Sequence, residues 1–340
     1  MIHTIQYYVP HEIEDLYQMQ KRFKFSGDDV DSVFHIRYPF ARFKLIKQYA
    51  KGKYYLSIHI DLIKMLGRAE IVDSDFDRVD GQISRMIFEL FLDYKAVTNS
   101  FLVRVDYRYD VKVTDPLQRK LLFHLYGKLA TQYGRLKKHL GKSNKASGEF
   151  EPYETSIYHS AKSSGILVYD KEEHLKDTEE MIMPYEEDVV RFEVRLSKPH
   201  LDYKKNPDKC SDPRDRTLKS YFKKSVYYKY MYRLLKPIYF KGDFRKFSEA
   251  KSIIEKSSLT PHQKKKLDEL ISQMNYSKAS ISSPVQKGTV SKPTFKKYLK
   301  LLETLNIHPI TIPKNMKGSP KRMANPLDEI FTEIEKATKK

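Results

Sequence analysis

The chain has 340 residues, of which 40% are hydrophobic and 31% charged, so it can build a folded core and wholesale disorder is excluded. A single cysteine, Cys210, excludes an intramolecular disulfide framework and a multi-cysteine zinc site, and it indicates a reducing compartment. No run approaches the ~18 apolar residues of a membrane span, and the opening residues lack the pattern of a signal peptide. We therefore expect a cytoplasmic protein of about two domains, with no membrane partner.

The net charge of +19 comes entirely from the C-terminal part of the sequence. Residues 198–340 hold 33 basic and 14 acidic side chains, whereas residues 1–197 hold 30 of each. This asymmetry predicts a polyanionic partner, and it favours nucleic acid over a merely solubilising surface. Lys outnumbers Arg there by 28 to 5, and because Lys acts as a point charge, the region suits phosphate contacts better than base reading.

The first part of the chain has the alternation of strands. The opening segment places Ile5, Tyr7 and Val9 on one face, and residues 33–49 and 53–63 follow the same period. A proline inside the second of these segments forces a break or an edge position there. Three strands are therefore predicted before any helix.

Helical periodicity then appears over residues 83–94, followed by the clearest strand of the chain at 101–113. Asp115 and Pro116 have the residue types of an N-cap and a first helical turn, which predicts a helix running to about Leu140.

A polar loop at 141–152 separates this helix from three further strands, predicted at 154–160, 165–170 and 187–197. The order βββαβαβββα with hairpin-length gaps predicts an α+β fold, in which helices flank a central, largely antiparallel sheet and a basic helical region follows. Helices of that region are predicted over residues 214–239, 244–257, 261–274, 293–305 and 327–337. The polar tail beyond residue 313 is expected to be mobile apart from its one short helix.

Two of the predicted strands carry a carboxylate on their polar face. Asp106 lies between Arg104 and Arg108 on one strand, and Glu193 lies between Arg191 and Arg195 on the other. With no cysteine pair or His-x-x-x-His pair, a metal site would use such carboxylates, which suit Mg²⁺ or Mn²⁺. If the strands are neighbours, a metal and arginines could hold a phosphodiester and stabilise its transition state. The alternation alone favours a plainer alternative, a solvated face with cross-strand ion pairs.

A third strand offers a nucleophile. Alternation places Tyr169 and Lys171 on one face, and a tyrosinate beside a cation or metal can attack phosphorus. The resulting phosphotyrosine ester keeps the energy of the broken bond, so the strand can later be resealed. Because the chain has 25 tyrosines, position alone does not single out Tyr169.

Together and in this order, these segments resemble replication initiators of the filamentous-phage gene-two type and the related rolling-circle initiators of small Gram-positive plasmids. The resemblance covers about residues 1–201. It rests on four segments, which are Met1-Ile2-His3-Thr4-Ile5, Arg104-Val105-Asp106, Leu167-Val168-Tyr169-Asp170-Lys171 and Val190-Arg191-Phe192-Glu193-Val194-Arg195-Leu196.

The resemblance implies a nicking enzyme. Tyr169 would attack origin DNA, become linked to the 5′ phosphate and leave a 3′ hydroxyl that primes rolling-circle replication, after which the displaced strand is rejoined. Asp106 and Glu193 would bind Mg²⁺ or Mn²⁺, and Lys171 would steady the charge of the tyrosinate or the phosphate. The family usually has Glu at the fifth position after the tyrosine, whereas this sequence has His174. A third ligand could therefore be His174 or a shifted Glu173, or His174 could be an ordinary surface residue.

The implied setting is a bacterial host cell, with the chain encoded by a phage or a plasmid. The implied partners are origin DNA, single-stranded at the nick, and a host helicase and polymerase, and a homodimer is left open. The arginines at 104, 191 and 195 would contact phosphate or serve plain structural pairing. The rival class is a non-catalytic DNA-binding protein, either a repressor or a single-strand binder.

Four segments are predicted along the chain: a nicking domain at 1–201, a basic helical DNA-binding region at 202–274, a Ser-rich linker at 275–291 and a C-terminal helix with its tail at 292–340. In the second, tyrosines interleaved with lysines suit either base stacking or packing. In the last, the start of the 293–305 helix resembles a groove-reading helix, with a simple docking helix equally open. The DNA-contact candidates of that helix are Lys296, Lys297 and Lys300.

Overall fold

The computed structural model describes all residues except 27–28, 49–52, 130–136, 139–140, 144–149, 153–154, 277–278, 315 and 339–340. The strands are β1 (Ile2–His11), β2 (Ala41–Gln48), β3 (Lys53–Asp61), β4 (Phe101–Lys112), β5 (Lys137–Lys138), β6 (Gly141–Ser143), β7 (Phe150–Pro152), β8 (Ser156–Ser160), β9 (Ser164–Asp170), β10 (Val189–Ser197), β11 (Phe244–Arg245) and β12 (Arg322–Met323).

The helices in the first 205 residues are α1 (Ile13–Phe23), α2 (Val30–Arg37), α3 (Leu62–Leu66), α4 (Phe76–Phe91), α5 (Tyr94–Asn99), α6 (Pro116–Leu129), α7 (Lys171–Asp177) and α8 (Lys198–Lys205). Those that follow are α9 (Leu218–Tyr221), α10 (Lys224–Leu235), α11 (Phe247–Lys256), α12 (Pro261–Asn275), α13 (Ser283–Gln286), α14 (Lys292–Thr304) and α15 (Asp328–Thr338). The predicted α+β fold is confirmed: a central antiparallel sheet is flanked by helices.

Contacts divide the chain into two compact units. The first unit comprises Met1–Arg108, Lys162–Gly165 and Glu193–Tyr230, and the second comprises Tyr109–Ala161, Ile166–Phe192 and Met231–Lys340. Because strands β4, β9 and β10 contribute to both, these units are clusters of contacts, and the domain limits expected from the sequence stay predictions.

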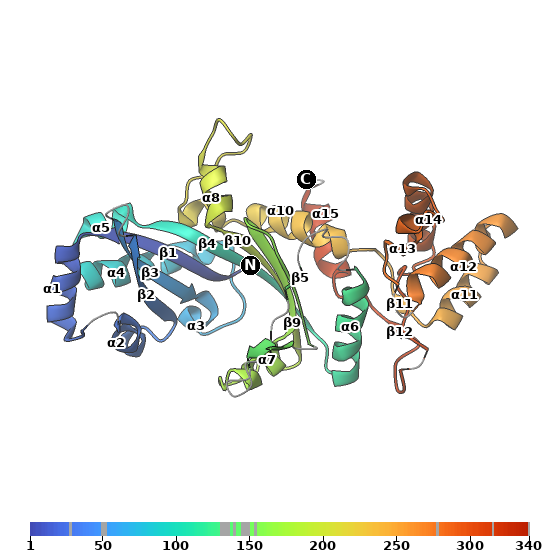
Figure 1. Cartoon of the computed structure of the whole chain (residues 1–340), viewed down its shortest axis with the longest axis horizontal. Helices are drawn as coiled ribbons and strands as arrows, with labels where there is room; N and C mark the ends of the chain where they lie inside the picture. Colours follow the sequence, from blue (N-terminus) through green and yellow to red (C-terminus); the bar gives the residue numbers. More distant parts are fainter. Residues whose placement is uncertain are drawn as a thin grey trace. The chain divides into compact units, whose positions relative to one another are not determined.

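In the first unit the strand order is β2-β3-β1-β4-β10. Ile5 of β1 pairs with Ile60 of β3 on one side and with Val105 of β4 on the other, so one face of the sheet is a continuous apolar row. All three side chains are fully buried. Helices α1, α2, α4 and α5 gather beside these strands (Figure 1). The odd-numbered residues of β1 from Ile5 onward are buried, which explains the alternation seen in the sequence.

The pairing of β1 with β4 contains an irregularity that decides where one histidine points. Ile2 pairs with Tyr107 and Thr4 with Asp106, so His3 is an extra residue on β1. Such a β-bulge interrupts the alternation locally, and a bulged side chain can move to the other face. The contacts of His3 described below are with residues of the polar face.

In the second unit the strand order is β4-β10-β9-β8-β5. The amide N–H of Val113 donates to the carbonyl of Asp188 at 2.8 Å and that of Asp170 donates to Thr155 at 3.0 Å, bonds that join the opposite ends of adjacent strands, as an antiparallel sheet requires. Helices α11–α14 form a cluster beside β11 and β12 (Figure 1).

Two predictions of secondary structure in the first half of the chain are wrong. Residues 33–37 belong to α2, because Phe34 packs edge-to-face on Phe43 of β2, with ring centroids 5.3 Å apart. The helix predicted to reach Leu140 is not continuous, because Lys137–Lys138 forms a strand paired with β8. Residues 130–136 and 139–140 lie outside the described residues, and so do residues 144–149 of the loop predicted at 141–152. The rest of that loop forms β6 and β7, which pair with each other.

Two C-terminal segments that the sequence assigned to a linker and a mobile tail contain packed elements, and the mobility of the tail stays a prediction. The predicted linker contains α13, and Ile281 is fully buried. In the tail, β12 pairs with β11, and Phe331 of α15 is 1% exposed with its ring stacked on Tyr239. The polar composition of the two segments did not reveal these buried residues, because a few well-spaced apolar side chains are enough to dock a short segment.

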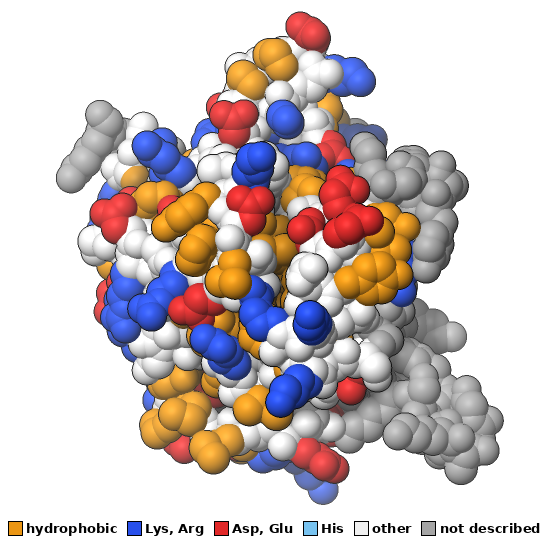
Figure 2. All heavy atoms as spheres, turned by 90° about the vertical axis from the view of Figure 1, so that its left-hand side faces the viewer, with side chains coloured by type: hydrophobic (Ala, Val, Ile, Leu, Met, Phe, Trp, Pro, Cys, Tyr) orange, Lys and Arg blue, Asp and Glu red, His pale blue; other side chains and the backbone are white. Residues whose placement is uncertain are grey.

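Among the described residues, no helix has the length and apolarity needed to cross a membrane. The face of the first unit that carries α1 and α2 mixes acidic, basic and hydrophobic side chains (Figure 2). This mixture agrees with the balanced charge of residues 1–197.

Candidate active site

The centre of the candidate site is Asp106 on β4, which is fully buried. Nε of Arg104 lies 2.9 Å from both of its carboxylate oxygens, and Nε of Arg195 on β10 lies 3.3 Å from both. Burial and the nearby Glu193 carboxylate raise the pKa of Asp106, and the two guanidinium groups partly offset that rise. The polar face is therefore not the solvated face that alternation alone favoured, since its central carboxylate is removed from water.

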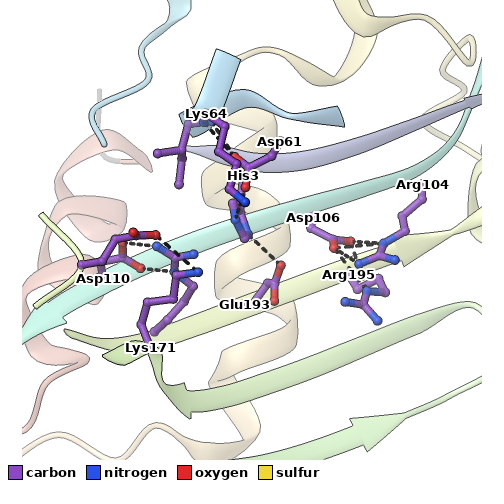
Figure 3. A network of polar contacts seen from close by, with 12 residues as sticks. His3, Asp61, Lys64, Arg104, Asp106, Asp110, Lys171, Glu193 and Arg195 are labelled. Carbon is purple, nitrogen blue, oxygen red and sulfur yellow. Dashed lines mark hydrogen bonds and ion pairs between the residues drawn. The ribbon is translucent and has the colours of Figure 1, made fainter. Parts of the chain in front are cut away.

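Glu193, on the neighbouring strand β10, contacts a residue that the sequence analysis gave no role. Its Oε1 lies 3.1 Å from Nδ1 of His3, and Nε2 of His3 lies 3.6 Å from Oδ2 of Asp61. Figure 3 shows Glu193, His3 and Asp61 pointing toward one another, and Asp106 turned toward Arg104. The bulge at His3 thus links three strands of the first unit through one imidazole.

His59 on β3 is a second histidine of this polar face. Burial, followed by Arg104, Arg195 and His3, lowers its pKa to about 4. Its Nε2 is buried without a hydrogen-bond partner among the described residues. A neutral imidazole nitrogen of this kind can accept a proton or bind a metal.

The donor chemistry of this face fits the predicted divalent cation. Asp106 and Glu193 supply carboxylate oxygens, which are the ligands that Mg²⁺ prefers, and Mn²⁺ also accepts imidazole nitrogen such as that of His3. Burial, and after it the charge of Glu193, raises the pKa of Asp106, and a bound cation would offset both effects. Within the described residues, no group of three or more such side chains is already arranged closely enough to hold a metal ion. The described side chains of this face are therefore of the types that bind such a cation, but they are not arranged as a complete metal site.

Tyr169 is the next-to-last residue of β9, lies in the second unit and is 6% exposed. Its ring lies edge-on to the ring of His174, with centroids 5.3 Å apart. The expectation that Lys171 shares a strand face with Tyr169 is wrong, because Asp170 caps α7 by accepting the N–H of Glu173 at 3.2 Å. Lys171 opens that helix, and its Nζ lies 3.3 Å from Glu186.

Asp170 is also held from the other side by Arg119 of α6. Nε of Arg119 donates to Asp170 at 2.8 Å, and the same buried guanidinium binds Asp188. The strand end that carries Tyr169 is thus fixed by a cap and an ion pair. Tyr169 belongs to the second unit and the two carboxylates to the first, so their meeting at one ion stays a prediction, as does the role of His174.

The remaining arginine candidate has a structural partner. Arg191 is fully buried and forms a bidentate pair with Asp110 in the second unit, with nitrogen–oxygen distances of 2.8 and 3.0 Å. This geometry favours structural pairing for Arg191, and its predicted contact with phosphate stays a prediction.

The polar face of the first unit continues into an aromatic end. The ring centroid of Tyr8 lies 5.3 Å from that of Tyr55 and 6.1 Å from that of Phe101, and Arg216 lies over Phe101 at 3.9 Å. A hollow of about 510 Å³ adjoins them, and Tyr55, Phe101 and Lys95 are among its lining residues. This volume falls within the range of small-molecule sites.

In the basic C-terminal region, the tyrosines and the lysines that were candidates for DNA contact differ in their exposure. Most tyrosines of α9 and α10 that were candidates for base stacking serve packing, since Tyr221, Tyr227, Tyr228 and Tyr230 are at most 8% exposed. Tyr232 of α10 differs, because it is 42% exposed. Lys296, Lys297 and Lys300 of α14 are all exposed.

Comparison with known proteins gives little. No family model matches the sequence, and no curated protein matches it. Among solved structures, the chain is similar to a rolling-circle replication initiator protein from Geobacillus stearothermophilus, with a TM-score of 0.25 and 12% identity over 59% of this chain and 76% of the other. A similarity this weak identifies neither the family nor the activity, and the resemblance to the gene-two type stays an expectation.

Proposed function

We propose that this chain is a replication initiator that nicks one strand of origin DNA through Tyr169 and later rejoins the displaced strand. The observation that carries the proposal is the buried pair of carboxylates, Asp106 and Glu193, set among Arg104, Arg195 and His3. Buried charges are costly, and carboxylates with perturbed pKa values cluster at functional sites, so this pair is a candidate for catalysis.

The reaction is a transfer of phosphorus between two oxygens. The phenolic oxygen of Tyr169 loses its proton and attacks the scissile phosphate, the bond from phosphorus to the 3′ oxygen breaks, and that oxygen takes up a proton to become the 3′ hydroxyl. The products are a 5′-phosphotyrosine ester and a primer end for rolling-circle synthesis. Rejoining is the same transfer in reverse, with a 3′ hydroxyl attacking the ester.

The polar face supplies the electrostatic part of this chemistry. Asp106 and Glu193 would hold Mg²⁺ or Mn²⁺, which, when bound, polarises the phosphate. Arg104 and Arg195 would share their guanidinium hydrogen bonds between Asp106 and the phosphate oxygens. His3 would orient Glu193 by holding one of its oxygens.

The single strand would enter over the aromatic end of this face. Tyr8 and Tyr55 offer partly exposed rings on which unpaired bases can stack, and Lys198 lies close enough to Tyr8 to lower its pKa against the rise caused by burial. This combination of rings and cations is typical of surfaces that bind single strands. The further partners, a host helicase and polymerase in a bacterial cytoplasm, belong to the same proposal.

The test is covalent capture. The full chain is incubated with a circular single strand and Mn²⁺, digested, and examined for a peptide that carries a nucleotide on Tyr169. Tyr169→Phe should retain DNA binding and lose the adduct, whereas Tyr17→Phe, at an exposed tyrosine, should keep both. Nicking that survives in Tyr169→Phe would reject the chemistry.

The rival function, a DNA-binding protein without catalysis, is favoured by one observation, which is the exposed lysine face of α14. The same experiment separates the two. Under the rival function, the chain binds DNA and no variant changes its covalent state, because no adduct ever forms.

A further inference from the structure

The cluster of α11–α14 has its own apolar centre within the second unit. Leu270 and Met274 of α12, Ile281 just before α13, and Phe295 and Leu302 of α14 are all at most 9% exposed. Each of these helices therefore presents one face to the others, and its second face is left for solvent or for a ligand.

The connection between α13 and α14 is a tight, fixed turn. Gly288 has a φ of +69°, a left-handed conformation that favours glycine, and Thr289 donates its hydroxyl hydrogen to Gln273 of α12 at 2.7 Å. Ser291 then caps α14 by accepting the N–H of Thr294 at 3.4 Å. A short helix, a glycine turn and a capped second helix make up a helix–turn–helix arrangement.

The exposed face of α14 is basic. At 100° per residue, Lys297 and Lys300 lie on the side opposite Phe295 and Leu302, and Thr294 lies one turn earlier beside them. Among the described residues, no ion-pair partner is found for Lys296, Lys297 or Lys300 of this helix. Residues 244–310 carry 13 basic and 5 acidic side chains, so the cluster as a whole is cationic.

We propose that α14 is a recognition helix that lies in the major groove of double-stranded DNA. The major groove is about 12 Å wide and admits one helix, and the lysines would contact the phosphates that border it while Thr294 faces the base edges. This ligand is a duplex, unlike the unpaired strand proposed for the first unit. The proposal goes beyond nicking and stands even if Tyr169 is not a nucleophile.

A charge-matched comparison tests it. The full chain is titrated against a pool of duplexes with a randomised centre and against the same strands unpaired. Lys297→Ala with Lys300→Ala should weaken duplex binding at least tenfold, and it should lower the slope of log affinity against log salt by about 2, because each lysine that neutralises a phosphate contributes about one to that slope. The control, Lys21→Ala with Arg78→Ala, removes two exposed basic residues of the first unit and should leave both values unchanged.

A second measurement locates the groove. On duplexes selected from the pool, guanine N7, which faces the major groove, should be protected from dimethyl sulfate by the parent chain and exposed with the α14 variant. Equal duplex affinity for the two double variants, or binding that leaves N7 unprotected, would overturn the proposal. The α14 variant should still form the Tyr169 adduct on a single-stranded oligonucleotide. Loss of duplex binding therefore tests the recognition helix, and absence of the adduct tests the nicking proposal.

Discussion

Two surfaces of this molecule are rich in charge, and they differ in what surrounds the charges. On the polar face of the first unit, Asp106 is fully buried and both of its oxygens are contacted by arginines. On α14 in the second unit, Lys297 and Lys300 are exposed to solvent. In the first case each charge depends on fixed neighbours, and in the second each charge acts nearly alone through water and salt.

The difference separates chemistry from affinity. A buried carboxylate held by guanidinium groups has a defined geometry and a shifted pKa, which is what bond-making requires. Exposed lysine side chains are not held in a fixed position, yet they attract a polyanion over a long range and release its counterions. The balanced charge of residues 1–197 and the surplus of residues 198–340 reflect this division in the sequence.

The largest expected effect comes from removing the buried charge. Asp106→Ala should lower the free energy of unfolding by about 3 kcal/mol, because it leaves Arg104 and Arg195 facing each other without their anion. We take the lower end of the usual range because these arginines keep 23% and 24% of their side chains exposed. Lys297→Ala should change it by less than about 0.5 kcal/mol. Urea unfolding measures the free energy of unfolding of both variants. Equal losses for the two substitutions would contradict the difference between the two surfaces.

A buried histidine of the second unit makes stability depend on pH. His308 is fully buried beside Phe244, and burial lowers its pKa to about 3, whereas an unfolded histidine has a pKa of about 6.5. Between these values unfolding takes up a proton, so acid favours the unfolded chain. From pH 7 to pH 5 the parent should lose about 2 kcal/mol more than His308→Leu does. Parallel pH profiles for the two proteins would contradict the burial of a neutral imidazole.

Much of the fold was predictable because its strands and helices are amphipathic. Alternation predicted β4 and β10 and placed Asp106 and Glu193 on their polar faces. It left open whether the two strands are neighbours, as they are in the sheet. The helix at α7 was missed because its signal is a single cap, Asp170, followed by two glutamates. Attention to that cap would have separated Lys171 from the strand face of Tyr169.

The two histidines of the site, His3 and His59, were not predicted as site residues, for different reasons. His59 and Asp61 alternate with buried isoleucines on β3, so the sequence already placed them on the polar face. His3 has the same parity as Ile5 and Val9, which alternation assigns to the core. Only the bulge moves it to Glu193, and a bulge depends on pairing with a distant strand that the local sequence does not specify.

His3 therefore offers a sharper test of the polar face. In the nicking assay, His3→Gln should raise the Mn²⁺ concentration for half-maximal rate about tenfold, because residues that orient a metal ligand typically contribute this much to metal affinity. His262→Gln, at an exposed histidine of α12, serves as the control and should have no effect. A lower rate at every Mn²⁺ concentration, with the midpoint unchanged, would assign His3 a role other than orienting Glu193.

The smallest effects concern two glycines, one in each unit, where a single methyl group should act in opposite directions. Gly81 lies inside α4 and Gly288 in the turn before α14, and at neither position would an added Cβ meet another atom within 4 Å. Backbone conformation alone thus decides the sign. Gly81→Ala should stabilise the chain by up to about 1 kcal/mol through helix propensity, and Gly288→Ala should destabilise it by about 1 kcal/mol, because its φ of +69° disfavours any side chain. If Gly288→Ala also weakens duplex binding, as a displaced α14 requires, while Gly81→Ala does not, then the rigid turn is part of the DNA-binding surface.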